Sequence, residues 1–63
     1  MEMNTRDTIM KKLLDAQEST RDYQSFSKEV VGEEVESTFK EFAEQCGMQA
    51  HRLQELLDKY DGK

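Results

Sequence analysis

The stretch that decides the fold runs from Val31 to Tyr60 and reads VGEEVESTFKEFAEQCGMQAHRLQELLDKY. It holds no proline, and its apolar side chains recur at alternating steps of four and three residues. Such spacing places them on one face of an α-helix. The opposite face is polar and carries Lys40, Glu44, His51, Glu55 and Asp58. The pattern predicts one long amphipathic helix over about residues 33–60.

The first half of the chain repeats the pattern with a thinner apolar stripe. Asn4 or Thr5 is suited to cap the start of a helix, and Asp7 would complement the helix dipole in the first turn. We therefore expect a first helix over about residues 5–28. Its stripe again alternates steps of four and three and consists of Ile9, Leu13, Ala16, Thr20, Tyr23, Ser27 and Val30.

A turn over about residues 29–33 is the third expected feature. Gly32 lies there, directly before three acids suited to a helix start. A single helix running through Gly32 is the alternative, because one glycine costs a helix only about 1 kcal/mol. We favour the hairpin, since Val30 and Val31 break the heptad phase and the two halves match in length.

A two-helix hairpin leaves half of each apolar stripe uncovered, which predicts self-association. Two antiparallel hairpins meeting face to face form a four-helix bundle with two-fold symmetry. The expected fold is therefore all-α, one domain over residues 1–63, assembled as a homodimer. We expect the dimer core to comprise Ile9, Leu13, Ala16, Tyr23, Val35, Phe39, Phe42, Cys46, Gln49, Leu53, Leu56 and Tyr60. A partial second stripe, Met3, Met10 and Leu14, is a candidate surface for a protein partner.

Composition excludes several classes of function. The 63 residues carry a net charge of −5, all of it in residues 29–63, and no basic cluster. This balance disfavours nucleic acid and anionic membranes as partners. One cysteine rules out an intramolecular disulfide and the CxxC pairs of zinc modules. No apolar run of about 18 residues and no charged-then-apolar leader occurs, so we expect a cytoplasmic location.

The stretch from Tyr23 through the turn to Leu57 resembles the helical hairpin of the ferritin-like and rubrerythrin-like superfamily. In that family the sequence of the second helix contains a phenylalanine, followed by Ala-Glu, then by Glu-x-x-His-Ala, and then by a leucine three residues further on. Phe39 or Phe42, Ala43-Glu44, Ala50 and Leu53 match those places. In length the chain is also similar to small uncharacterised hairpin proteins of spore-forming Firmicutes, which lack the iron ligands.

The resemblance implies a bundle that could hold two iron ions, but the ligand positions are changed. The two places of Glu-x-x-His fall on Cys46 and Gln49, and the counterpart in the first helix is Ala16. Iron centres of this kind require carboxylate and imidazole ligands. We therefore expect no metal and no cofactor.

Single residues that could carry chemistry have plainer interpretations. His51 falls on the polar face, so we expect a surface histidine. Cys46 is interpreted as a small buried apolar residue, with an intersubunit disulfide or redox role as its alternative. Gln49 could pair with its symmetry mate and fix the register. The sequence thus predicts a non-enzymatic homodimeric structural or interaction module; the alternative is a degenerate metal or redox protein using Cys46.

Overall fold

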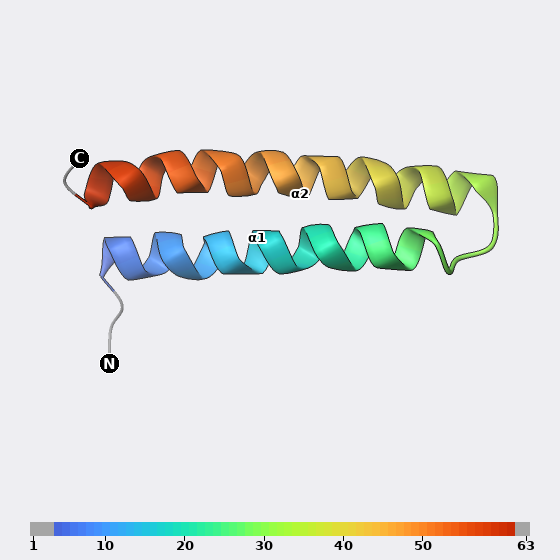
Figure 1. Cartoon of the computed structure of the whole chain (residues 1–63), viewed down its shortest axis with the longest axis horizontal. Coiled ribbons are helices and arrows are strands. Elements are labelled where there is room, and N and C mark those ends of the chain that lie inside the picture. The colour runs from blue at the N-terminus through green and yellow to red at the C-terminus, as the bar shows by residue number, and fades with distance from the viewer. Residues whose placement is uncertain (1–3, 62–63) are drawn as a thin grey trace.

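The computed structural model describes residues 4–61, which form two antiparallel helices joined by a short turn (Figure 1). Helix α1 spans Thr5–Ser27 and helix α2 spans Glu33–Tyr60. The expected all-α hairpin is confirmed. Helix α1 lies beside α2 along its whole length, and the start of α2 extends past the end of α1 at the turn. Both ends of the described chain lie at the same end of the hairpin.

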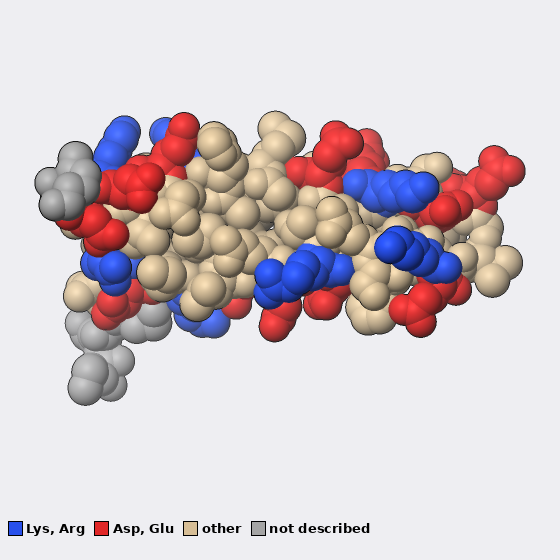
Figure 2. Space-filling model, in the orientation of Figure 1, with Lys and Arg blue, Asp and Glu red and all other residues tan. Residues whose placement is uncertain are grey.

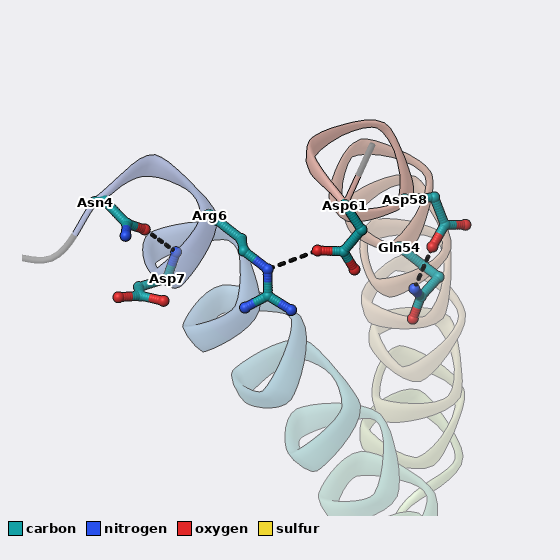
Figure 3. Close-up of polar contacts among 6 residues, drawn as sticks. All are labelled: Asn4, Arg6, Asp7, Gln54, Asp58 and Asp61. Carbon is teal, nitrogen blue, oxygen red and sulfur yellow. Dashed lines mark hydrogen bonds and ion pairs between the residues drawn. The ribbon is translucent and has the colours of Figure 1, made fainter. Parts of the chain in front are cut away.

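Helix α1 begins where the sequence offers a capping side chain. Asn4 has extended backbone angles, and its Oδ1 accepts a hydrogen bond of 2.8 Å from the backbone N–H of Asp7 (Figure 3). This bond satisfies one of the N–H groups that the first helical turn leaves without a partner. Of the two expected capping residues, the structure therefore selects Asn4.

The chain reverses between α1 and α2, so a continuous helix through Gly32 does not form. The backbone N–H groups of Glu29 and Val30 both donate to the carbonyl of Phe26, at 2.9 and 3.1 Å, and close the end of α1. Gly32 then takes a φ of 118°, a region that side chains with a Cβ rarely enter. Its carbonyl accepts from the backbone N–H of Glu36 at 3.0 Å and starts α2. Glycine is required here for its conformation, since no atom crowds the position.

The contact between the helices, which we call the seam, consists of the buried and half-buried residues spaced four and three apart on each helix. On α1 these are the residues expected from the sequence. On α2 the seam is turned by about 50° from the predicted stripe, at about 100° per residue. It shares three residues with that stripe and adds Ala43, Ala50 and Leu57. The seam comprises Ile9, Leu13, Ala16, Thr20, Tyr23 and Ser27 of α1 and Phe39, Ala43, Cys46, Ala50, Leu53 and Leu57 of α2.

Two hydroxyl side chains lie in the seam without an energetic penalty. The Ser27 hydroxyl, on a residue only 3% exposed, donates to the carbonyl of Gln24 at 2.8 Å. The Thr20 hydroxyl donates to the carbonyl of Ala16 at 2.9 Å. A buried hydroxyl without a partner would cost about 1–3 kcal/mol. Bonding to their own helix therefore allows small polar residues to bring α1 and α2 close together.

An ion pair joins the two helices at the open end of the hairpin. Arg6 Nε donates to Asp61 Oδ1 at 2.6 Å (Figure 3). The hydrogen bond from Arg6 and the charge of Asp61 raise the pKa of the Arg6 guanidinium above its ordinary value. Both side chains are about two-fifths exposed. Water screens exposed pairs of this kind, so the pair orients the helix ends more than it stabilises the fold.

Candidate functional site

The seam buries little apolar surface. Among the described residues only four apolar side chains are buried, each 3–6% exposed: Leu13, Ala16, Ala43 and Leu57. Two of the four are alanines, which cover little surface. Several larger apolar side chains of α2, among them Val35, Phe42 and Tyr60, are exposed and lie outside the seam.

A second, uncharged strip runs along α2 beside the seam, and we call it the outer face. Its residues fall within about 80° of one another on the helix. Val35 is 41% exposed, Phe42 36% and Tyr60 57%. Leu56 is half-buried, and Gln45 and Gln49 are exposed. The outer face comprises Val35, Thr38, Phe42, Gln45, Gln49, Leu56 and Tyr60.

Aromatic side chains link the outer face to α1. The ring of Tyr23 meets Phe39 and Phe42 edge to face, with centroids 5.4 and 5.5 Å apart. Such pairs contribute about 0.5–1.5 kcal/mol beyond the area they bury. Phe26, one helical turn beyond Tyr23, is 50% exposed. The aromatic cluster is therefore packed on its inner side and open on its outer side.

The changed ligand positions of the iron site are divided between the seam and the outer face. Ala16 is buried in the seam, Cys46 is half-buried, and Gln49 lies on the outer face. Within residues 4–61, no three His, Cys, Asp or Glu side chains gather closely enough to hold a metal ion. The imidazole of His51 is 79% exposed and 3.6 Å from a carboxylate oxygen of Glu55. This exposed placement agrees with the surface position expected for His51.

The candidate surface for a protein partner lies only partly within the described residues. Met3 lies outside the described residues. Met10 is half-buried and Leu14 is 56% exposed. These positions fall about 100° or more from the α1 seam and well away from the outer face.

An open groove of about 740 Å³ lies between the helices on the side away from the outer face. The two hydroxyls in it, those of Thr20 and Ser27, donate to backbone carbonyls of their own helix and not to a general base. Such a groove offers no nucleophile held by a base, the arrangement that covalent catalysis needs. It is lined by Thr20, Gln24, Ser27, Lys28, Lys40, Ala43, Glu44, Gly47 and Met48.

Charge on the broad face shown in Figure 2 is mixed. Lys and Arg side chains lie among Asp and Glu along most of this face, and the largest uncharged area lies left of the middle in this view. No large patch of one sign is visible on this face. Phosphate backbones bind surfaces with a concentrated positive field, and this face does not provide one.

No protein-family model matches the sequence, and neither a curated protein nor a solved structure matches it. Over the described residues, neither helix combines the length and the apolar character needed to cross a bilayer.

The sequence interpretation missed three seam residues, Ala43, Ala50 and Leu57. A signal for them was present, because they continue the series Phe39, Ala43, Cys46, Ala50, Leu53, Leu57, which also alternates four and three. Helix α2 therefore carries two overlapping stripes. The prediction followed the stripe that contains Phe42, Leu56 and Tyr60, whereas the stripe that contains Ala43, Ala50 and Leu57 faces α1.

Proposed function

We propose that the chain is a non-enzymatic structural or interaction module that works as a homodimer, in which two hairpins pack their outer faces together as a four-helix bundle. The observation that carries the proposal is the outer face, where large apolar and aromatic side chains have uncharged neighbours and α1 covers only part of them: Val35, Phe42 and Tyr60 stay 36–57% exposed. Exposed apolar surface of this extent is typical of a protein–protein contact.

The surface area supports the same conclusion. The chain exposes 5077 Å², more than the roughly 4200 Å² expected of a compact monomer of its mass. Two helices about 40 Å long and about 10 Å wide present roughly 800 Å² on one side, which is the area each partner buries in a standard stable interface. A second copy therefore fits the chemistry of the outer face, and one side of the whole hairpin is large enough for a stable contact.

The test is to change the outer face and compare it with an equally exposed control. Val35→Gln/Tyr60→Gln removes two exposed apolar side chains of the outer face. Leu14→Gln/Met48→Gln removes two that are 56% and 70% exposed but lie elsewhere. Sedimentation equilibrium should find the wild type and the control dimeric at micromolar concentration. The outer-face variant should dissociate at least about tenfold more readily, since each burial contributes about 1.5–3 kcal/mol when complete.

Two results would overturn the proposal. One is a wild-type chain that stays monomeric at millimolar concentration while keeping its full helicity. The other is a dimer that the Leu14/Met48 variant dissociates and the Val35/Tyr60 variant does not, which would move the contact to the other side of the hairpin.

A further inference from the structure

Four charged residues border the outer face of α2 on the side away from α1. Glu34 and Glu41 lie in the first half of the helix, and Arg52 and Lys59 lie in the second half. At about 100° per residue all four fall within about 20° of one another. All four are exposed. This border, which we call the charged edge, is therefore acidic at one end and basic at the other.

The charged edge forms few ion pairs within one hairpin. Over the described residues, Glu34, Glu41 and Lys59 form no ion pair within 4 Å, and Arg52 pairs only with Glu55, three residues along the same helix, at 3.1 Å. None of the four contacts α1 through its charge. Glu34 in the first turn and Lys59 in the last turn suit the helix dipole. Glu41 and Arg52 lie in the interior of α2, where the dipole gives no such preference, so their order has no explanation of this kind within a single chain.

Given the homodimer proposed above, on which this inference rests, we infer that α2 packs antiparallel against α2 of the second copy, about a two-fold axis near residues 46–48. In that arrangement Glu34 of each copy lies opposite Lys59 of the other, and Glu41 lies opposite Arg52. A parallel two-fold arrangement would instead place the two charged edges on opposite sides of the contact, so that neither pair could form.

The apolar residues give the same axis independently of the charges. The pairs Glu34 with Lys59 and Glu41 with Arg52 are each centred between residues 46 and 47. The pairs Val35 with Tyr60, Phe39 with Leu56, Phe42 with Leu53 and Cys46 with Gln49 are each centred between residues 47 and 48. Each pair has at least one member on the outer face, and the other members, Phe39, Leu53 and Cys46, are half-buried seam residues at its border. The two centres differ by one residue, about 1.5 Å along a helix.

The same axis passes close to the middle of α2, which spans residues 33–60. An antiparallel partner would therefore overlap the entire helix and leave no apolar end uncovered. Gln49 lies less than one turn from the axis, so the two Gln49 side chains of a dimer fall at its centre. There a polar pair can fix the register.

The test reverses the charged edge in two halves. Glu34→Lys/Glu41→Lys makes the edge wholly basic, and Arg52→Glu/Lys59→Glu makes it wholly acidic. Each should weaken the homodimer at least about tenfold at low salt, because attractive pairs at both ends become repulsive. The fourfold variant, which combines both changes, restores opposite charges and should return the dimer dissociation constant to within about threefold of wild type.

If only the net charge of the chain affected dimerisation, the two half-reversals would give a different result. The first variant moves the net charge of the chain toward zero and the second moves it further from zero. A nonspecific charge effect would therefore strengthen the first dimer and weaken the second. Weakening of both, with recovery in the fourfold variant, is expected only if the charged edges oppose each other in reversed order.

A distance measurement provides a second readout. Ser37 is exposed and faces away from the outer face, so a spin label on Ser37→Cys in a Cys46→Ser background should not disturb the contact. Antiparallel α2 helices would place the two residue-37 backbones about 30 Å apart, whereas parallel helices would place them less than about 20 Å apart. Pulsed electron resonance separates the two values.

The outcomes distinguish this inference from the proposed function. A wild-type chain that does not dimerise overturns both. A wild-type dimer whose dissociation constant is unchanged by the two half-reversals, or whose label distance is below about 20 Å, overturns only the antiparallel arrangement.

Discussion

The two sides of helix α2 differ in how far their apolar side chains are covered. Toward α1, the seam mixes the small residues Ala43, Cys46 and Ala50 with Phe39, Leu53 and Leu57, and all six are buried or half-buried. Beside it, Val35, Phe42 and Tyr60 keep between 36% and 57% of their surface exposed. In a self-sufficient fold large apolar residues are mostly buried. The comparison teaches that the seam covers only part of the apolar surface of α2 and leaves the outer face for another contact.

This division has an energetic consequence for a chain of 63 residues. A domain so small buries only about 60% of the surface that its unfolded chain exposes, and its stability is marginal. Alanine and serine in the seam add little burial to that total. Assembly through the outer face would supply what the seam lacks, so stability should rise with protein concentration.

The largest expected effect comes from breaking the seam at Leu57, which is 3% exposed. Leu57→Ala removes most of a buried side chain and should lower the free energy of unfolding by about 2–4 kcal/mol. Urea denaturation followed by circular dichroism measures the change. The matched control, Met48→Ala on the same helix at 70% exposure, should stay within about 0.5 kcal/mol of wild type. Equal losses in both variants would contradict the assignment of the seam.

Two glycine variants, one in the turn and one inside α2, should change the free energy of unfolding in opposite directions. Gly32→Ala forces a Cβ into a backbone with φ of 118° and should destabilise the hairpin by about 1–3 kcal/mol. Gly47→Ala lies inside α2 where a Cβ meets no atom within 4 Å, and should stabilise it by about 0.5–1 kcal/mol. Thermal unfolding measures both. A loss at residue 47 would show that the open space beside it is needed.

Cys46 lies where the seam and the predicted dimer core overlap, so its replacement sharpens the comparison. Cys46→Ser should keep the helicity and the dimer, and should change the free energy of unfolding by less than about 1.5 kcal/mol, because only a small, half-buried thiol becomes a hydroxyl. Circular dichroism, sedimentation and metal analysis of chelator-free protein provide the test. Stoichiometric iron, zinc or copper in the wild type, lost in the variant, would support the metal or redox alternative instead.

The smallest expected effect is at the open end of the hairpin. Arg6→Ala removes the ion pair with Asp61, which is exposed on both sides. Global stability should hardly change, whereas hydrogen exchange in the last turn of α2 should accelerate and lose its dependence on salt. Lys11→Ala, which removes an exposed pair with Asp15 inside α1, is the control and should leave that turn unaffected. A large global loss in Arg6→Ala would show that the pair contributes more than orientation.

Much of the fold could be predicted from local signals. Asn4 caps α1 because its side chain can accept from Asp7, and that information lies within four residues of sequence. Gly32 similarly marks the reversal by a backbone conformation that glycine adopts without strain. The alternation of apolar residues in α1 was enough to place Leu13 and Ala16 in the seam.

The part that could not be predicted is which stripe of α2 faces α1. Phe39, Cys46 and Leu53 belong to both stripes, and periodicity alone cannot rank Ala43 and Leu57 above Phe42 and Leu56. The choice depends on helix packing: α1 offers Ala16, Thr20 and Ser27, and against such small residues the close approach of α2 favours alanine over phenylalanine. The ligand positions inferred from the ferritin-like resemblance depend on the same choice, and in the single chain Gln49 lies on the outer face.

The contact between Arg6 and Asp61 gives the hairpin two unlike poles: one carries both ends of the described chain, and the other carries only the turn around Gly32. Hairpins linked in tandem through a short connection would therefore lie side by side, as a row, and would not extend one another end to end. A label or fused domain on either end of the chain occupies the same pole. In an antiparallel dimer the two poles alternate, so such additions would project from opposite ends of a short rod.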